Sequence, residues 1–179
     1  MKRIVSVAVT VLTLAACAAP DGAQDSELTA GQLAALADTF QMEGEKFSQG
    51  LADLDGPAIA GLFAEELIYF DNGNIYPSRA RIDEIATGFF DRLERLEGHW
   101  EPSNVLVLGP DAGVFWGVFH ADDANWNDSE ANPPEQRGQA LWEDGYSWTL
   151  VYQRSAHGGF EVTHAHQSSL PPGRLDQYK

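Results

Sequence analysis

The sequence predicts an α+β domain in which three helices pack on one face of a strongly curved sheet. Two observations carry this prediction. Apolar residues recur at helical spacing through much of residues 29–98, and after Gly98 apolar and polar residues alternate with the period of a strand. A length of 179 residues fits one domain. We therefore expect N-terminal helices followed by a long run of mainly antiparallel strands.

The first half of the chain is expected to hold three helices, at residues 29–52, 58–65 and 78–98. Thr29 is a suitable N-cap for the first, and Gly56-Pro57 separates the first from the second. The apolar face of the third includes Leu93 and Leu96. A short hairpin lies between the second and third helices, with strands at residues 67–70 and 75–76.

Four long strands are expected after Gly98, at residues 99–108, 113–122, 139–155 and 160–169. Gly and Pro residues mark the turns around Pro110 and Gly158. The stretch 122–137 is polar and contains Pro133-Pro134, so we expect a solvated loop there.

The first residues have the pattern of a secretion signal. Met1-Lys2-Arg3 is positively charged, and residues 4–16 form an uncharged apolar run that is short for a membrane span. The sequence Leu14-Ala15-Ala16-Cys17 resembles a bacterial lipobox, in which the cysteine is lipidated and becomes the new N-terminus. The expected division is a signal peptide, a lipidated tether, the domain and a tail, at residues 1–16, 17–28, 29–170 and 171–179.

Lipidation of Cys17 implies a protein of the bacterial cell envelope, because several acyl chains together make a stable membrane anchor. Ala18 after the cysteine suits the outer membrane of a Gram-negative cell, facing the periplasm. An ordinary secretory signal cleaved nearby is the alternative. Cys17 is the only cysteine, so we expect no disulfide and no thiol nucleophile in the mature domain.

The net charge and the absence of several sequence motifs disfavour some classes of function. The chain has 27 acidic and 11 basic residues, a net charge of −16, which disfavours nucleic acid as a partner. It contains no glycine-rich phosphate loop, no GxSxG motif and no HExxH motif. We therefore expect no cofactor, and the usual signatures of nucleotide binding, serine hydrolysis and zinc proteolysis are missing.

Several segments together resemble a known family. They are Asp53-Leu54-Asp55, residues 58–63, Tyr69-Phe70-Asp71-Asn72-Gly73, residues 105–112 and the closing pattern of Phe160, Val162, His164, His166 and Ser168. Their order and spacing over about residues 30–170 resemble the NTF2-like superfamily, and within it the SnoaL-like, ketosteroid-isomerase-like branch.

The resemblance implies a cone whose sheet wraps around the helices and leaves an apolar pocket open at one end. Members often pair as dimers through their sheets. Some are isomerases, dehydratases or cyclases, and others bind a small molecule or serve as interaction domains. The isomerases combine an Asp base with Tyr and acid donors. Asp71 lies near the matching strand, but its place in Asp71-Asn72-Gly73 is that of a turn residue.

Acid–base chemistry is one interpretation of the polar residues. Alternation along the last strand places His164 and His166 on the same face as Phe160, which we expect to be the inner face. Asp144 shares a face with Trp148, where burial would raise the pKa of its carboxyl. His164, His166 and Asp144 are therefore candidate catalytic residues for isomerisation or dehydration without a cofactor.

Two other interpretations stay open. The pair His164 and His166 could bind a metal with His120 or Asp144 as a third ligand, but zinc sites usually have three or more protein ligands, so no metal is predicted. Both histidines could instead be core residues. Aromatic residues are abundant, and we expect a ligand pocket lined by Tyr69, Trp100, Trp116, His120, Tyr146 and Trp148.

The function we expect from the sequence is a lipid-anchored envelope protein whose pocket binds a small apolar molecule. Catalysis by the His and Asp side chains is the first alternative. The second is an interaction module, with a homodimer formed through the sheet as a further expected partner.

Overall fold

The computed structural model describes residues 28–138 and 145–169, and it begins with helix α1 (Ala30–Ala52). The Thr29 side chain accepts a hydrogen bond from the Gln32 backbone N–H at 3.3 Å, and the Thr29 backbone N–H donates to the Gln32 side chain at 2.9 Å. This capping box satisfies N–H groups that the first turn of a helix leaves without partners. The predicted first helix is confirmed.

The other elements keep the predicted order but differ in their bounds. Within the described ranges, no helix is both long and apolar enough to cross a membrane. The elements after α1 are α2 (Gly56–Gly61), β1 (Phe63–Asp71), β2 (Asn74–Ser78), α3 (Arg79–Phe90), β3 (Leu93–Gly109), β4 (Ala112–Trp126), β5 (Tyr146–Arg154) and β6 (Phe160–Ser169).

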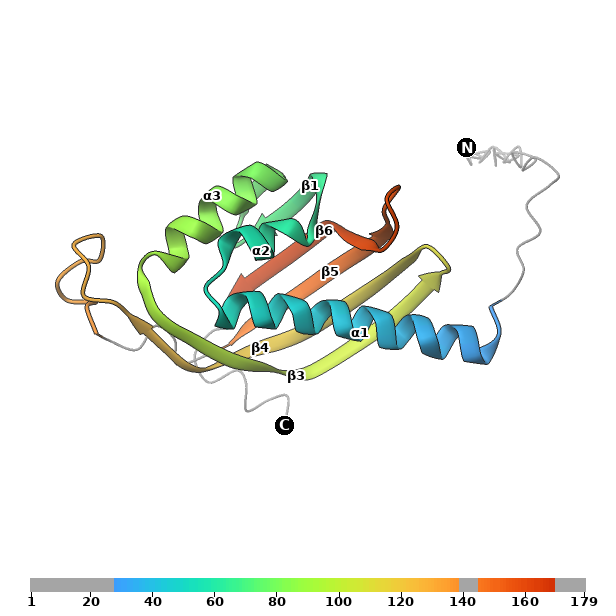
Figure 1. Cartoon of the computed structure of the whole chain (residues 1–179). Coiled ribbons are helices and arrows are strands. Elements are labelled where there is room, and N and C mark those ends of the chain that lie inside the picture. The colour runs from blue at the N-terminus through green and yellow to red at the C-terminus, as the bar shows by residue number, and fades with distance from the viewer. Residues whose placement is uncertain (1–27, 139–144, 170–179) are drawn as a thin grey trace, which may run out of the picture.

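The strands form one six-stranded mixed sheet in the order β2-β1-β6-β5-β4-β3. All neighbours are antiparallel except β1 and β6, which are parallel. The three helices lie on one face of this sheet, which curves around them (Figure 1). The predicted α+β class, with a curved mixed sheet against helices, is confirmed.

Helix α1 fills the concave side of the sheet with aromatic side chains. Phe40 and Phe47 are buried, and the ring of Phe40 lies 5.7 Å from that of Tyr152 on β5. Gly113 on β4 leaves room for this packing, because a Cβ at that position would overlap the Phe40 ring. The sheet and α1 therefore share one core.

The third helix is shorter than the sequence predicts. It ends at Phe90, and Leu93 and Leu96, which we expected on its apolar face, belong to β3 and are buried there. Two exposed residues separate these leucines, and the β3–β4 register shifts after Leu93. A bulge of this kind lets residues three apart face the same side of a sheet, so the spacing resembles that of a helix.

The second helix also ends early, since residues 63–65 already belong to β1. The polar stretch after β4 is not simply solvated either. Asn132 is 1% exposed, and its amide donates to the Arg92 carbonyl at 2.8 Å and accepts from Arg92 Nε at 2.9 Å. These bonds hold the loop against the start of β3.

Gly98 gives a direct test of how closely the backbones of β3 and β4 approach each other. A Cβ at Gly98 would overlap the carbonyl oxygen of His120 on β4, which is backbone and cannot rotate away. Gly98→Ala should lower the free energy of unfolding by about 1–3 kcal/mol, measured by urea denaturation. The control is Gly88→Ala in α3, where a Cβ meets nothing and stability should be equal or up to about 1 kcal/mol higher. Equal loss in both variants would contradict this close approach at Gly98.

Candidate functional site

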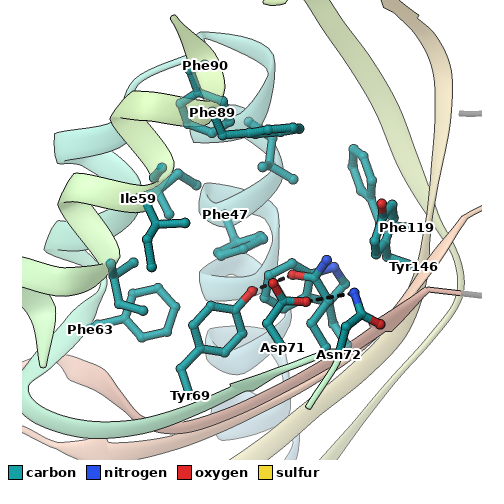
Figure 2. A pocket seen from close by; sticks show the side chains of 16 residues that line it. Phe47, Ile59, Phe63, Tyr69, Asp71, Asn72, Phe89, Phe90, Phe119 and Tyr146 are labelled. Carbon is teal, nitrogen blue, oxygen red and sulfur yellow. Dashed lines mark hydrogen bonds between the residues drawn. The ribbon is translucent and has the colours of Figure 1, made fainter. Parts of the chain in front are cut away.

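A cavity of about 230 Å³ lies between the helices and the concave face of the sheet (Figure 2). Its described lining is mainly apolar. Eight lining residues are aromatic: Phe47, Phe63, Tyr69, Phe89, Phe90, Phe119, Tyr146 and Trp148. Five are aliphatic: Leu51, Ile59, Ile82, Ile85 and Ala86. Three are polar: Asp71, Asn72 and Gln167.

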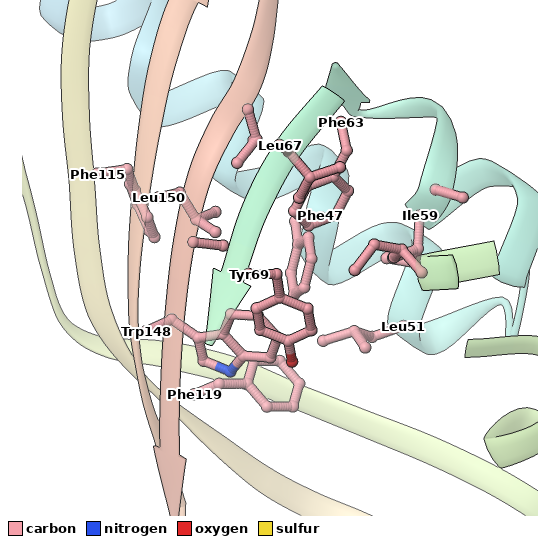
Figure 3. Close-up of a cluster of buried hydrophobic side chains, with 14 of the residues drawn as sticks. Phe47, Leu51, Ile59, Phe63, Leu67, Tyr69, Phe115, Phe119, Trp148 and Leu150 are labelled. Carbon is pink, nitrogen blue, oxygen red and sulfur yellow. The ribbon is translucent and has the colours of Figure 1, made fainter. Parts of the chain in front are cut away.

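Aromatic rings from several elements pack on one another to build the wall (Figure 3). The rings of Tyr69 and Trp148 are stacked with centroids 5.7 Å apart, and Phe47 meets Trp148 edge to face at 4.7 Å. Phe63 adds a further contact to Tyr69 at 6.2 Å. Interlocked rings of this kind have little freedom to move into the cavity, so its shape is set by packing.

The polar residues gather at one end of the cavity, where β1 ends beside β6. Asp71 pairs with Gln167 across these parallel strands. The Tyr69 hydroxyl donates a hydrogen bond to Gln167 Oε1. Figure 2 shows Tyr69, Asp71 and Asn72 side by side, with Phe89 and Phe90 on the far wall. The parallel pairing therefore brings together groups that are almost a hundred residues apart in sequence.

Asn72 fixes the Asp71 carboxylate. Its side-chain nitrogen donates to Asp71 Oδ1 at 2.9 Å, and its side-chain oxygen accepts from the Ser169 backbone N–H at 3.0 Å. Asn72 has a φ of 46°, in the left-handed region that Asn tolerates better than most residues. Both ends of the Asn72 amide are thus committed, and Asp71 is held at the cavity edge.

Burial shifts the pKa values of Asp71 and Tyr69 at the polar end of the cavity. Desolvation raises the pKa of the Asp71 carboxyl, and the hydrogen bond from Asn72 lowers it by less. Desolvation also raises the pKa of the Tyr69 phenol, with the charge of Asp71 as the next cause. Tyr69 therefore keeps its proton, whereas Asp71 holds a proton to higher pH than an exposed Asp does.

The prediction that His164 and His166 face the cavity is wrong. The β5–β6 register shifts where Val151 pairs with His164 and Tyr152 with Val162, so Thr163 is an extra residue. One extra residue turns every later side chain to the opposite face. His164 therefore lies against Phe70 on the outer face, with ring centroids 5.6 Å apart, and His166 is exposed.

The six expected pocket residues divide between the two faces. Tyr69, Tyr146 and Trp148 line the cavity. Trp100 packs beside it in the core, with its ring 5.1 Å from Phe115 and its indole N–H donating to the Gly44 carbonyl. Trp116 and His120 were also expected to line the pocket, and this prediction is wrong. Both lie on the outer face of β4.

His120 instead belongs to a surface pair. It stacks on His99 of β3 at 5.2 Å, and its Nε2 lies 2.6 Å from the Glu101 carbonyl oxygen. His99 Nδ1 lies 2.6 Å from Asp122, which raises the pKa of His99 chiefly through this hydrogen bond. In the described part of the chain, no three His, Cys, Asp or Glu side chains are arranged to hold a metal ion. Asp144 and Cys17 lie outside the described residues.

Asp71, Asn72 and Gln167 are the site residues that the sequence analysis missed. Asp71 lies two residues after Tyr69, and strand alternation alone would have placed both on one face. Its Asp-Asn-Gly context pointed instead to a turn. Gln167 becomes an inner residue only through the extra residue Thr163, for which the sequence carries no clear signal.

Comparisons with known proteins identify the fold. A ketosteroid isomerase-like protein from Erwinia carotovora atroseptica superposes with a TM-score of 0.63 at 12% identity, covering 80% of this chain and 100% of that one. A proposed scytalone dehydratase from Novosphingobium aromaticivorans gives 0.62 at 9% identity, covering 80% and 89%. An NTF2-like superfamily protein from Salmonella enterica serovar Typhimurium gives 0.64 at 15% identity, covering 78% and 94%.

Comparisons of sequence give no further assignment, since no protein-family profile and no curated protein matches the chain. Identities of this size between structures establish the fold but not the chemistry of the cavity. With helices against one curved mixed sheet and β1 parallel to β6, the chain has the NTF2-like fold.

Proposed function

We propose that the cavity binds a small, largely apolar molecule and orients one polar group of it at the end formed by Tyr69, Asp71 and Gln167. The observation that carries the proposal is the distribution of the lining, with thirteen apolar or aromatic residues and the three polar ones gathered at one end. Ligand sites in proteins usually have this composition. An apolar cavity of about 150 Å³ accepts benzene, so about 230 Å³ suits a single ring with a short substituent.

Filling the cavity tests this role. Benzyl alcohol at about one hundred times its Kd should add about 2.7 kcal/mol to the free energy of unfolding. Ala86→Leu puts a larger side chain on the cavity wall and should abolish this gain, whereas Ala34→Leu on the exposed side of α1 should keep it. Differential scanning calorimetry measures the shift. No shift in the unaltered protein, or equal shifts in both variants, would contradict binding in the cavity.

Acid–base catalysis is the second candidate function, and it rests on Asp71 rather than on Asp144 and the histidines. The raised pKa of the Asp71 carboxyl favours this role, because proton transfer is most efficient when the pKa is near the working pH. The neighbouring Tyr69 keeps its proton, which it donates to Gln167, so Asp71 is the group at this end that would exchange a proton with a ligand. Asp71→Asn removes proton transfer and leaves the apolar wall intact, so a neutral ligand should still bind this variant.

We also propose that two copies associate through the outer face of the sheet. Two rows of side chains cross five strands there: Ile68-His164-Val151-Val114-Leu106 and Phe70-His166-Thr149-Trp116-Asn104. These outer rows contain no carboxylate, although the chain has 27 acidic residues. Ile68, Leu106 and Trp116 are 48%, 50% and 40% exposed. Two strongly acidic copies could therefore meet here without direct repulsion between carboxylates.

A charge in the outer rows should prevent this association. In the full chain carrying Cys17→Ser, which excludes association through lipid, sedimentation velocity should give a dimer. Adding Trp116→Glu should give a monomer, since a buried unpaired carboxylate is costly in an interface. Met42→Glu is the control, because Met42 is 54% exposed on α1 and lies away from the sheet. A monomer before substitution, or a dimer that survives Trp116→Glu, would rule out this interface.

The membrane anchor is the remaining part of the proposed function. It is supported by the charged start, the apolar run and the lipobox-like Leu14-Ala15-Ala16-Cys17, which together favour a lipoprotein of the bacterial envelope, in the outer membrane facing the periplasm.

The anchor depends on one sulfur atom. Cys17→Ser should give an unlipidated protein that leaves the membrane fraction, whereas Ala18→Ser should keep the lipid because it retains the cysteine. Mass spectrometry of the mature N-terminus and cell fractionation measure both effects. Membrane retention of the Cys17→Ser protein would show that another feature anchors the chain.

A further inference from the structure

We propose that the molecule bound in the cavity carries a positive charge, as an organic ammonium group seated against Asp71 and the surrounding aromatic rings. This inference rests on the proposed binding function and names its ligand class. It is argued from the charges, the rings and the hydrogen-bond acceptors of the lining.

The charge balance of the cavity is the first argument. Its described lining includes one carboxylate, Asp71, and no Lys, Arg or His. Within the described residues, Asp71 forms no ion pair, and its side-chain hydrogen bond comes from the neutral amide of Asn72. A half-buried carboxylate is stabilised by a cation nearby, and no Lys, Arg or His of the described residues pairs with Asp71. A cationic ligand would complete the pair, and an anionic ligand would be repelled.

The aromatic wall is the second argument. Half of the sixteen described lining residues carry aromatic rings. The face of an aromatic ring is electron-rich and attracts an ammonium group, and this attraction grows when the group is removed from water. Figure 2 shows Tyr69 beside Asp71, with Phe119 and Tyr146 on another side of the same space. Aromatic rings are the usual partners of organic ammonium groups, and here the Asp71 carboxylate adds an opposite charge beside them.

Hydrogen bonding at the polar end agrees with this chemistry. The Tyr69 proton is committed to Gln167, so the Tyr69 oxygen retains lone pairs that can accept a hydrogen bond. The Asp71 carboxylate is also an acceptor, whereas the Asn72 amide is occupied at both ends. Among the described residues the Gln167 amide N–H groups have no acceptor, so they can donate to a neutral part of the ligand. The Tyr69 oxygen and the Asp71 carboxylate are therefore two acceptors at this end, which suits a group that donates N–H bonds.

The net charge of the whole chain also favours a positively charged ligand. A net charge of −16 creates a negative potential that raises the local concentration of cations and lowers that of anions. This effect alone is not specific to the cavity. A test must therefore separate the field of the whole protein from the contribution of Asp71.

Three ligands of nearly equal size separate the possibilities: benzylamine, which is a cation near pH 7, neutral benzyl alcohol and anionic benzoate. Isothermal titration calorimetry of the full chain should show that benzylammonium binds about tenfold tighter than benzyl alcohol, and that benzoate binds weakest. In Asp71→Asn, the affinity for benzylammonium should fall to that for benzyl alcohol. Benzyl alcohol should bind this variant within about twofold of its original affinity, because the apolar wall is unchanged.

Asp91→Asn is the matched control. It removes the same charge from an exposed residue at the end of α3 that does not line the cavity, so the preference for benzylammonium should persist. An equal loss in Asp71→Asn and Asp91→Asn would overturn the proposal, because it would trace the preference to net charge. If benzyl alcohol binds the unaltered protein as tightly as benzylammonium or more tightly, the proposed positive charge of the ligand is wrong. Binding in the cavity would still stand. Failure of all three ligands to bind would overturn both.

Discussion

The parallel pairing of β1 with β6 is the constraint on which the rest of the site depends. It sets Tyr69 beside Ala165 and Asp71 beside Gln167, and it is continued by the bonds from Ser169 to Asn72. Parallel neighbours cannot be joined by a tight turn. Most of the domain therefore lies between β1 and β6 in sequence, and α3, β3, β4 and β5 close the cavity around the polar end that this pairing creates.

The extra residue in β6, Thr163, decides which side chains of that strand face the cavity and which face outward. Before Thr163, Val162 faces the core beside Tyr152. After it, Ala165 and Gln167 face inward and the two histidines outward. A regular strand would have placed two imidazoles in the cavity and a glutamine outside. The same bulge places His164 and His166 in the outer rows, so the polar end of the cavity and the histidines of the proposed dimer face follow from one local irregularity.

Much of the fold could be predicted from the sequence, because the signals are local. The capping box at Thr29 fixes the start of α1, and the change of apolar period near Gly98 separates helices from strands. The boundary between α3 and β3 could not be predicted, since Leu93 and Leu96 reach the core from a bulged strand with the spacing of a helix. Pairing with β4 overrides local preference there.

The site was less predictable than the fold, because its polar residues depend on long-range pairing rather than on local sequence signals. Tyr146 and Trp148 follow regular alternation along β5 and line the cavity. Asp71 and Gln167 depend on a long-range pairing and on a bulge, and neither leaves a clear trace in a single sequence. The resemblance to the NTF2-like superfamily indicated the architecture, but it did not supply the residues of the polar end.

Two local features meet at the end of β1. Asn72 has a left-handed backbone conformation, and Asp71 is a desolvated carboxylate without an ion-pair partner among the described residues. The Asn72 conformation is the one that the two-residue Asn-Gly turn between β1 and β2 requires, whereas the desolvated carboxylate is a cost that proteins keep mainly where a site requires it. Asn72 links the two, because its left-handed turn brings its amide onto Asp71 while Ser169 holds the other end. The hairpin turn thus also orients the carboxylate, and a bound cation would offset the desolvation of Asp71.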